Sequence, residues 1–241
     1  MARESALRRH VVVYLSGSHA YGFPSPDSDV DLKAVHLTDT RTVLGLAAPA
    51  PAVDRMEWLD GVELDYTSNE LGQVLGGLLR GNGNYLERVL CPTVIAADEP
   101  VLARIRDLAP AFLSQRAHGH YRGFAKQQRA DLERKPTVKR LLYVLRTLAT
   151  GIWLLERGEV VADLPQLADG LGLDGVDALI ARKRSGELAE LDRASIEAWA
   201  ARVDGLFARI DAARTESPLP ADPAEPGALD ALLVDVRLAA L

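Results

Sequence analysis

The apolar positions near the start of the chain follow the patterns of β-strands. The unbroken run Val11-Val12-Val13-Tyr14-Leu15 ends at Ser16-Gly17-Ser18 and predicts a buried strand that enters a tight turn. Over most of residues 29–37 apolar and polar side chains alternate, which predicts a second strand. Pro24 and Pro26 lie between the two strands and predict a loop, because proline cannot continue a regular ladder of hydrogen bonds.

A β-hairpin is predicted around Asp60-Gly61. Residues 53–59 and 62–67 flank this dipeptide, which is the strongest local hairpin signal in the chain. With a two-residue turn, Leu59 faces Val62 and Met56 faces Asp65. A short helix is predicted over residues 38–46, ahead of the hairpin.

After residue 68 the apolar spacing changes to that of helices. Ser68 or Asn69 is expected to cap a helix that carries five apolar side chains, Leu71, Val74, Leu75, Leu78 and Leu79. Further helices are predicted over residues 85–90, 101–115 (bent or split at Pro110), 116–133, 137–157, 176–184 and 194–215. Four prolines in residues 217–227 indicate a linker, and residues 228–241 predict an amphipathic helix that docks back onto the protein.

Composition is that of an ordinary globular protein. The 241 residues are 48% hydrophobic and 26% charged, which is typical of a folded globular protein and not of a disordered or low-complexity chain. Cys91 is the single cysteine, so a disulfide framework and a thiolate zinc site are excluded. No apolar run reaches the roughly 18 residues that a membrane span needs, and the sequence therefore predicts a cytoplasmic protein with no membrane partner.

Charge is spread unevenly along the chain. The net charge is −6, yet residues 104–146 hold eleven basic and three acidic side chains, a local charge of +8. Such a segment can attract phosphates whatever the total charge of the protein. A solvated helix surface is the alternative interpretation of the same residues.

The candidate chemistry lies in three aspartates. Asp29 and Asp31 are two residues apart in a predicted strand, so their carboxylates project from the same face about 6.5–7 Å apart. Carboxylates this close repel one another, and a divalent cation removes that cost. Asp65 could supply a third carboxylate if its strand lies beside residues 29–37. Hard oxygen ligands suit Mg²⁺ or Mn²⁺.

Gly17-Ser18, directly after the first strand, suits a phosphate. A glycine lets the backbone approach a phosphate closely, a following helical turn presents free N–H groups, and Ser18 adds a hydroxyl donor. A P-loop motif is absent from the sequence, and residues 27–38 lack the glycine and glutamate of a calcium-binding loop. Taken alone, the Ser28-Asp29-Val30-Asp31 cluster also fits a set of turn or cap residues.

The complete motif is more specific than its parts. Gly17-Ser18-His19-Ala20-Tyr21-Gly22, five residues, and then Ser28-Asp29-Val30-Asp31-Leu32 resembles the signature of DNA-polymerase-β-like nucleotidyltransferases, in the subgroup of the RNA-repair type. Val62-Glu63-Leu64-Asp65 resembles the strand that carries the third carboxylate of that superfamily, and residues 139–146 its basic helix. The resemblance spans about residues 11–160.

The resemblance implies an α+β fold in three consecutive parts. Residues 1–100 would form the polymerase-β-like catalytic domain, a short mixed β-sheet flanked by helices. Residues 101–215 would form an all-helical domain that closes the cleft, and residues 216–241 a proline-rich linker and a C-terminal helix.

The resemblance also implies a reaction. A nucleoside monophosphate would pass from an NTP, such as ATP, to an acceptor hydroxyl, with release of pyrophosphate. Asp29, Asp31 and Asp65 would be catalytic and would ligate two Mg²⁺ or Mn²⁺ ions, with Asp65 also taking the acceptor proton. Gly17, Ser18, Lys139 and Arg140 would bind the nucleotide. The acceptor would be RNA, for example at its 3′ end.

Two other functions fit the same residues. One is NMP transfer to a protein or a small molecule, and the other is a nucleotide-binding or interaction module without turnover. All three carboxylates are present, which favours an enzyme. The sequence predicts neither the base of the NTP nor an oligomeric state.

Overall fold

A computed structural model describes residue 4 and residues 7–46, 52–186 and 189–241. Two compact units make up the chain, and each is assembled from separate segments. We call Met1–Ser16, Asp29–Ser114 and Asp222–Leu241 the sheet unit, and Gly17–Ser28 with Gln115–Ala221 the helical unit. These units are drawn differently from the three consecutive parts expected from sequence, whose boundaries at residues 100 and 215 stay a prediction.

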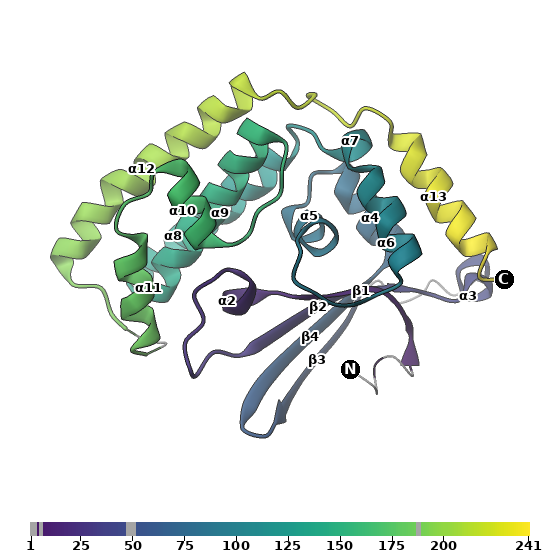
Figure 1. The fold of residues 1–241 in the computed structure, drawn as a ribbon, viewed down its shortest axis with the longest axis horizontal. Coiled ribbons are helices and arrows are strands. Elements are labelled where there is room, and N and C mark those ends of the chain that lie inside the picture. The colour runs from purple at the N-terminus through teal and green to yellow at the C-terminus, as the bar shows by residue number, and fades with distance from the viewer. Residues whose placement is uncertain (1–3, 5–6, 47–51, 187–188) are drawn as a thin grey trace. The chain divides into compact units, whose positions relative to one another are not determined.

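A five-stranded mixed sheet forms the base of the sheet unit (Figure 1). Its order is β3-β4-β2-β1-β5, with bounds β1 (Arg9–Leu15), β2 (Val30–Leu37), β3 (Ala52–Leu59), β4 (Val62–Glu70) and β5 (Val94–Ala97). Strands β2 and β4 run parallel, and the other neighbouring pairs are antiparallel. Together with the helices below, this sheet confirms the predicted α+β class. The short strand β5 was not predicted.

The hairpin between β3 and β4 has the predicted register. Leu59 lies opposite Val62, and Met56 lies opposite Asp65. Asp60 and Gly61 have φ angles of 51° and 83°. Positive φ at both central residues is what a two-residue type I′ turn requires, and Asp-Gly supplies it at low cost.

Six helices of the described residues belong to the sheet unit. They are α3 (Thr40–Leu44), α4 (Leu71–Leu79), α5 (Gly83–Leu90), α6 (Glu99–Asp107), α7 (Ala109–Phe112) and α13 (Pro226–Leu238). In Figure 1, α4, α5 and α6 lie on one side of the sheet. The predicted cap of α4 is wrong: β4 continues to Glu70, whose carboxylate accepts the backbone N–H of Gly72 at 2.6 Å.

The C-terminal helix α13 docks within the sheet unit. It packs against α4, α6 and α7. The Nη2 atom of Arg237 lies 2.7 Å from Oε1 of Glu70, and only 14% of the arginine and 8% of the glutamate side chain is exposed. Arg237 thereby connects the last helix to the residue that caps α4, which confirms that the amphipathic segment docks back onto the protein.

The helical unit is built around one long helix. Its helices are α2 (Gly17–Ala20), α8 (Ala117–Arg134), α9 (Val138–Arg157), α10 (Leu164–Leu171), α11 (Val176–Arg184) and α12 (Arg193–Glu216). Helix α9 contacts α8, α10, α11 and α12 (Figure 1). It is buried along most of its length. Thr137 caps α9 by accepting the backbone N–H of Arg140. Helix α10 was not predicted.

Replacement of Arg237 by methionine tests the docking of α13. Arg237→Met leaves the buried Glu70 carboxylate without its cation, so we expect the free energy of unfolding of the sheet unit to fall by about 2–3 kcal/mol. The measurement is urea unfolding, with hydrogen exchange of α13 and α4. Arg104→Met is the control, because Arg104 and Asp235 form an exposed ion pair from α6 to the same helix, whose loss should cost less than about 1 kcal/mol. Equal effects of the two substitutions would contradict a special role for Arg237.

Candidate functional site

Asp31 and Asp65 lie side by side in the sheet unit. They are register partners in the parallel pair of β2 and β4, so both side chains leave the same face of the sheet. The opposite face carries an apolar cluster that includes Leu32, Ala34 and Tyr66. The exposed fractions of the two aspartate side chains are 19% and 40%. Two partly exposed carboxylates are therefore held next to each other on this face of the sheet.

A lysine that sequence reasoning missed lies between these two carboxylates. The Nζ atom of Lys33 is 2.8 Å from Oδ2 of Asp65 and 3.6 Å from Oδ1 of Asp31. It also donates to Oγ1 of Thr67 at 3.3 Å. Lys33 is two residues after Asp31 and so shares its face, and that spacing is the signal that could have revealed it.

Asp29 directly precedes β2 and is half-buried. In the residues that the structure describes, no group of three His, Cys, Asp or Glu side chains is placed to hold a metal ion. The structure thus brings together two of the three predicted ligands, and the role of Asp29 stays a prediction. The donor set itself suits a divalent cation: two hard carboxylate groups in register already share the positive charge of Lys33.

Gly17 and Ser18 form the start of the short helix α2 in the helical unit. Gly17 has a φ of 64°, a left-handed conformation that glycine adopts readily. The Ser18 side chain is buried, and its Oγ atom has no hydrogen-bond partner among the described residues. A buried hydroxyl without a partner is costly, which fits a residue that contacts a ligand.

Aromatic contacts hold the loop after α2 within the helical unit. The guanidinium of Arg146 lies 3.9 Å from the ring centre of Tyr21. The ring of Tyr143 packs edge-on against those of Tyr21 and Phe23, at centroid distances of 5.9 and 5.5 Å. The backbone N–H of Leu164 donates to the carbonyl of Tyr21 at 2.9 Å. Helices α9 and α10 therefore fix the path of the segment that carries the Gly-Ser turn.

A buried lysine holds the end of the same loop. The ammonium of Lys183, on α11, donates to Oγ of Ser25 at 3.0 Å and to Oγ of Ser28 at 3.2 Å. The lysine side chain is completely buried. Ser28 is the residue directly before Asp29, so a helix far along the sequence positions the serine of the Ser-Asp-x-Asp motif.

Part of the positive charge of residues 104–146 is balanced by ion pairs with acidic residues from elsewhere in the chain. Within the helical unit, Arg122 pairs with Asp211 at 2.7 Å and Arg129 with Asp204 and Glu133. The hydrogen bond from Arg122 lowers the pKa of Asp211, and the same bond raises the pKa of Arg122. These arginines join α8 to α12, so a structural role explains them.

Lys139 and Arg140 line one polar pocket of the helical unit. Its volume is about 330 Å³, and the other lining residues are Gln128, Asp131, Lys135, Thr137 and Tyr143. Arg140 donates to the carbonyl of Lys135 at 3.2 Å. The two predicted nucleotide-binding residues are thus neighbours in a basic pocket.

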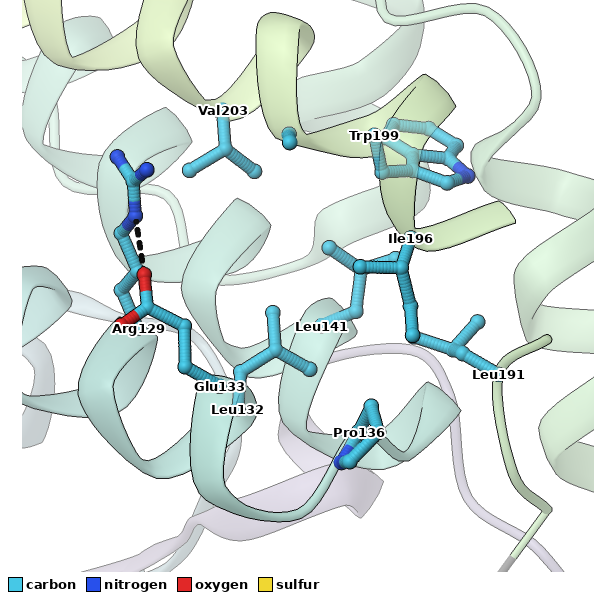
Figure 2. A pocket seen from close by; sticks show the side chains of 10 residues that line it. Arg129, Leu132, Glu133, Pro136, Leu141, Leu191, Ile196, Trp199 and Val203 are labelled. Atoms are coloured by element: carbon cyan, nitrogen blue, oxygen red, sulfur yellow. Dashed lines mark hydrogen bonds and ion pairs between the residues drawn. The ribbon is translucent and has the colours of Figure 1, made fainter. Parts of the chain in front are cut away.

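A second pocket of the helical unit is apolar and smaller, with a volume of about 120 Å³. Figure 2 shows the indole of Trp199 and the side chains of Ile196 and Val203 around it, with the ion pair of Arg129 and Glu133 at its side. No predicted site residue lines this pocket.

The family model of the RNA repair pathway DNA polymerase beta family, RlaP, matches residues 2–235. The chain belongs to this family. The resemblance predicted from residues 11–160 is therefore confirmed and extends over almost the whole chain. Membership in this family supports a nucleotidyltransferase-like protein.

Two curated relatives match part of this chain. It is 31% identical over 159 residues to the uncharacterized protein MJ0002 of Methanocaldococcus jannaschii, covering 64% of this chain and 63% of that protein. It is 25% identical over 186 residues to the uncharacterized protein YcgL of Bacillus subtilis, covering 73% and 70%. The chain thus spans just under two thirds of the length of the first relative.

The chain is also similar to a solved structure, that of the nucleotidyltransferase-like protein from Exiguobacterium sibiricum, over 99% of this chain and 73% of that one. The TM-score is 0.34 and the sequence identity is 13%.

Across the parts of the chain that the structure describes, no helix combines the length and the apolar character that crossing a bilayer requires.

Substitution of Lys183 tests how α11 holds Ser25 and Ser28. Lys183→Met removes the donor to both serines, so we expect a loss of about 2 kcal/mol in the stability of the helical unit and faster hydrogen exchange in residues 24–28. Arg184→Met is the control, because this neighbour on α11 is exposed. Unchanged exchange of the loop in Lys183→Met would contradict the assigned role.

Proposed function

We propose that this chain is a metal-dependent nucleotidyltransferase that moves a nucleoside monophosphate from an NTP to an acceptor hydroxyl. The observation that carries the proposal is the pair Asp31 and Asp65, in register on parallel strands and sharing one cationic group. Family membership supports the same reaction class.

The three carboxylates share one task in this proposal, and Asp65 has a second. Asp29, Asp31 and Asp65 would hold two Mg²⁺ or Mn²⁺ ions. When bound, these ions neutralise charge on the attacking and leaving oxygens of the transfer. Asp65 accepts the proton of the acceptor hydroxyl while the oxygen of that hydroxyl forms a bond to the α-phosphorus. The bond from the α-phosphorus to the bridging oxygen of the β-phosphate breaks, and pyrophosphate leaves with that electron pair.

The phosphates of the NTP are assigned to residues of the helical unit. Gly17 and the buried Ser18 hydroxyl would hold the β- and γ-phosphates, since that hydroxyl has no partner among the described residues. Lys139 and Arg140 would bind nucleotide or acceptor phosphates, which fits their common pocket. Arg140 suits this role because it presents planar donors that match phosphate oxygens.

RNA is the acceptor that we propose, with its 3′ hydroxyl as the nucleophile. The RNA repair description of the family supports this choice. Transfer to a protein or a small molecule is the alternative. Incubation with α-labelled NTPs, Mg²⁺ and a total cell extract separates these acceptors by the fraction that carries the label. Absence of label from every fraction, for wild type as for Asp29→Ala/Asp31→Ala, would overturn the proposed activity.

The role of Asp65 can be separated from nucleotide binding. We expect Asp65→Asn to lower kcat at least about 100-fold and to change the Kd of the NTP less than about threefold, because Asp29 and Asp31 remain. Rapid-quench kinetics and calorimetric titration of a non-hydrolysable NTP give the two values. A similar loss in both would show that Asp65 mainly binds the nucleotide.

Charge reversal tests the basic pocket. Lys139→Glu/Arg140→Glu should weaken RNA binding and reduce the slope of log K against log salt by about 1.4, since each phosphate contact to a single strand contributes about 0.7. Binding is measured by fluorescence anisotropy at several salt concentrations. Arg184→Glu/Arg214→Glu is the matched control, because both arginines are exposed residues of the same unit. If the two double variants behave alike, Lys139 and Arg140 belong to the solvated surface.

A further inference from the structure

The side chain of Lys33 places an ammonium group beside the carboxylates of Asp31 and Asp65. Its ammonium contacts one oxygen of Asp65 at 2.8 Å and is 3.6 Å from one oxygen of Asp31. Its third neighbour is the hydroxyl of Thr67 at 3.3 Å. All four residues lie on the same face of β2 and β4, as two adjacent pairs of register partners. Lys33 is itself mostly buried, with 21% of its side chain exposed.

This arrangement solves an electrostatic problem of the fold. Parallel pairing places two carboxylates on neighbouring strands, about 4.8 Å apart along the sheet, where their charges repel. The ammonium of Lys33 lies between them and balances part of that charge without any bound ion. The protein can therefore form this pair of strands before a metal is present.

We propose that Lys33 is the resident counter-cation of the Asp31–Asp65 pair and competes with the divalent metal for the same carboxylate oxygens. The inference rests on the proposed function, since the metal is the one that the transferase would use. Metal binding then requires Lys33 to give up its contact with Asp65. Lys33 therefore lowers the affinity for metal and stabilises the metal-free state.

A positioning role for Lys33 gives the opposite result. If the ammonium holds Asp65 in the orientation that binds metal, its removal weakens metal binding. If Lys33 competes, its removal strengthens metal binding. The sign of the change in metal affinity therefore separates the two roles, and no measurement of catalysis is needed.

The experiment is a titration of the full chain with Mn²⁺ alone, followed by calorimetry and by the electron paramagnetic resonance signal of free Mn²⁺. We expect Lys33→Met to lower the Kd for Mn²⁺ about tenfold, because the metal then no longer has to displace the ammonium from Asp65. Lys33→Arg keeps a cation at the site and should bind Mn²⁺ as weakly as wild type. Lys126→Met is the control for net charge, because Lys126 is exposed on α8 in the other unit.

Thermal unfolding supplies a second measurement. In EDTA, Lys33→Met should melt at a lower temperature than wild type, because the two carboxylates then repel without a counter-charge. Added Mn²⁺ should raise its Tm by more than it raises that of wild type. If Lys33→Met does not fold, Lys33→Gln removes the charge and retains a donor for Thr67, and the same two results are expected of it.

An equal or higher Kd in the uncharged variants would overturn the proposal, as would a Tm in EDTA no lower than that of wild type. These outcomes are independent of the transfer reaction. Tighter Mn²⁺ binding in a protein that transfers no nucleotide would support the role of Lys33 and contradict the proposed function. Transfer by the wild type with unchanged Mn²⁺ affinity in Lys33→Met would do the reverse.

Discussion

Parallel pairing of β2 with β4 is the constraint on which the candidate site depends. It places Asp31 and Asp65 at the same level of the sheet and directs both toward the face opposite the apolar cluster. A shift of one residue in either strand would turn one carboxylate toward that cluster. The apolar side chains of Leu32 and Tyr66 therefore do more than fill the core: they fix which face the carboxylates occupy.

The sequence motif is divided between the two units. Gly17 to Ser28 belong to the helical unit and are held by aromatic contacts and by Lys183, whereas Asp29 and the following strand belong to the sheet unit. Within the motif, the chain passes from the helical unit to the sheet unit at the peptide bond between Ser28 and Asp29, which is one of four crossings between the units. Groups assigned to phosphates and groups assigned to metals are thus supported by different sets of packed residues, although they are neighbours in sequence.

Local patterns predicted most of the elements, and long-range contacts explain the rest. The register of Leu59 with Val62 follows from two adjacent turn residues. The cap of α4, in contrast, depends on contacts between strands. The hydroxyl of Ser68 is hydrogen-bonded to Nδ1 of His36 at 2.8 Å, and pairing with β2 extends the strand to Glu70. Strand β5 is only four residues long and depends on β1. Part of the charge of the basic segment is likewise balanced from a distance, because α12 supplies the carboxylates of Asp204 and Asp211 from far along the chain.

The candidate site was predictable where strand alternation decides it. Asp31 and Asp65 were identified as partners on the condition that their strands are neighbours, and Lys33 could have been added by the same rule. The support from Lys183 could not, since it is 155 residues from Ser28 along the chain. A fragment that ends before α11 would retain each residue of the Gly-Ser and Asp-x-Asp motif and yet lack the ammonium that anchors its serine. The boundaries of a fragment that keeps the motif intact therefore have to be chosen from the contacts of the motif and not from its sequence alone.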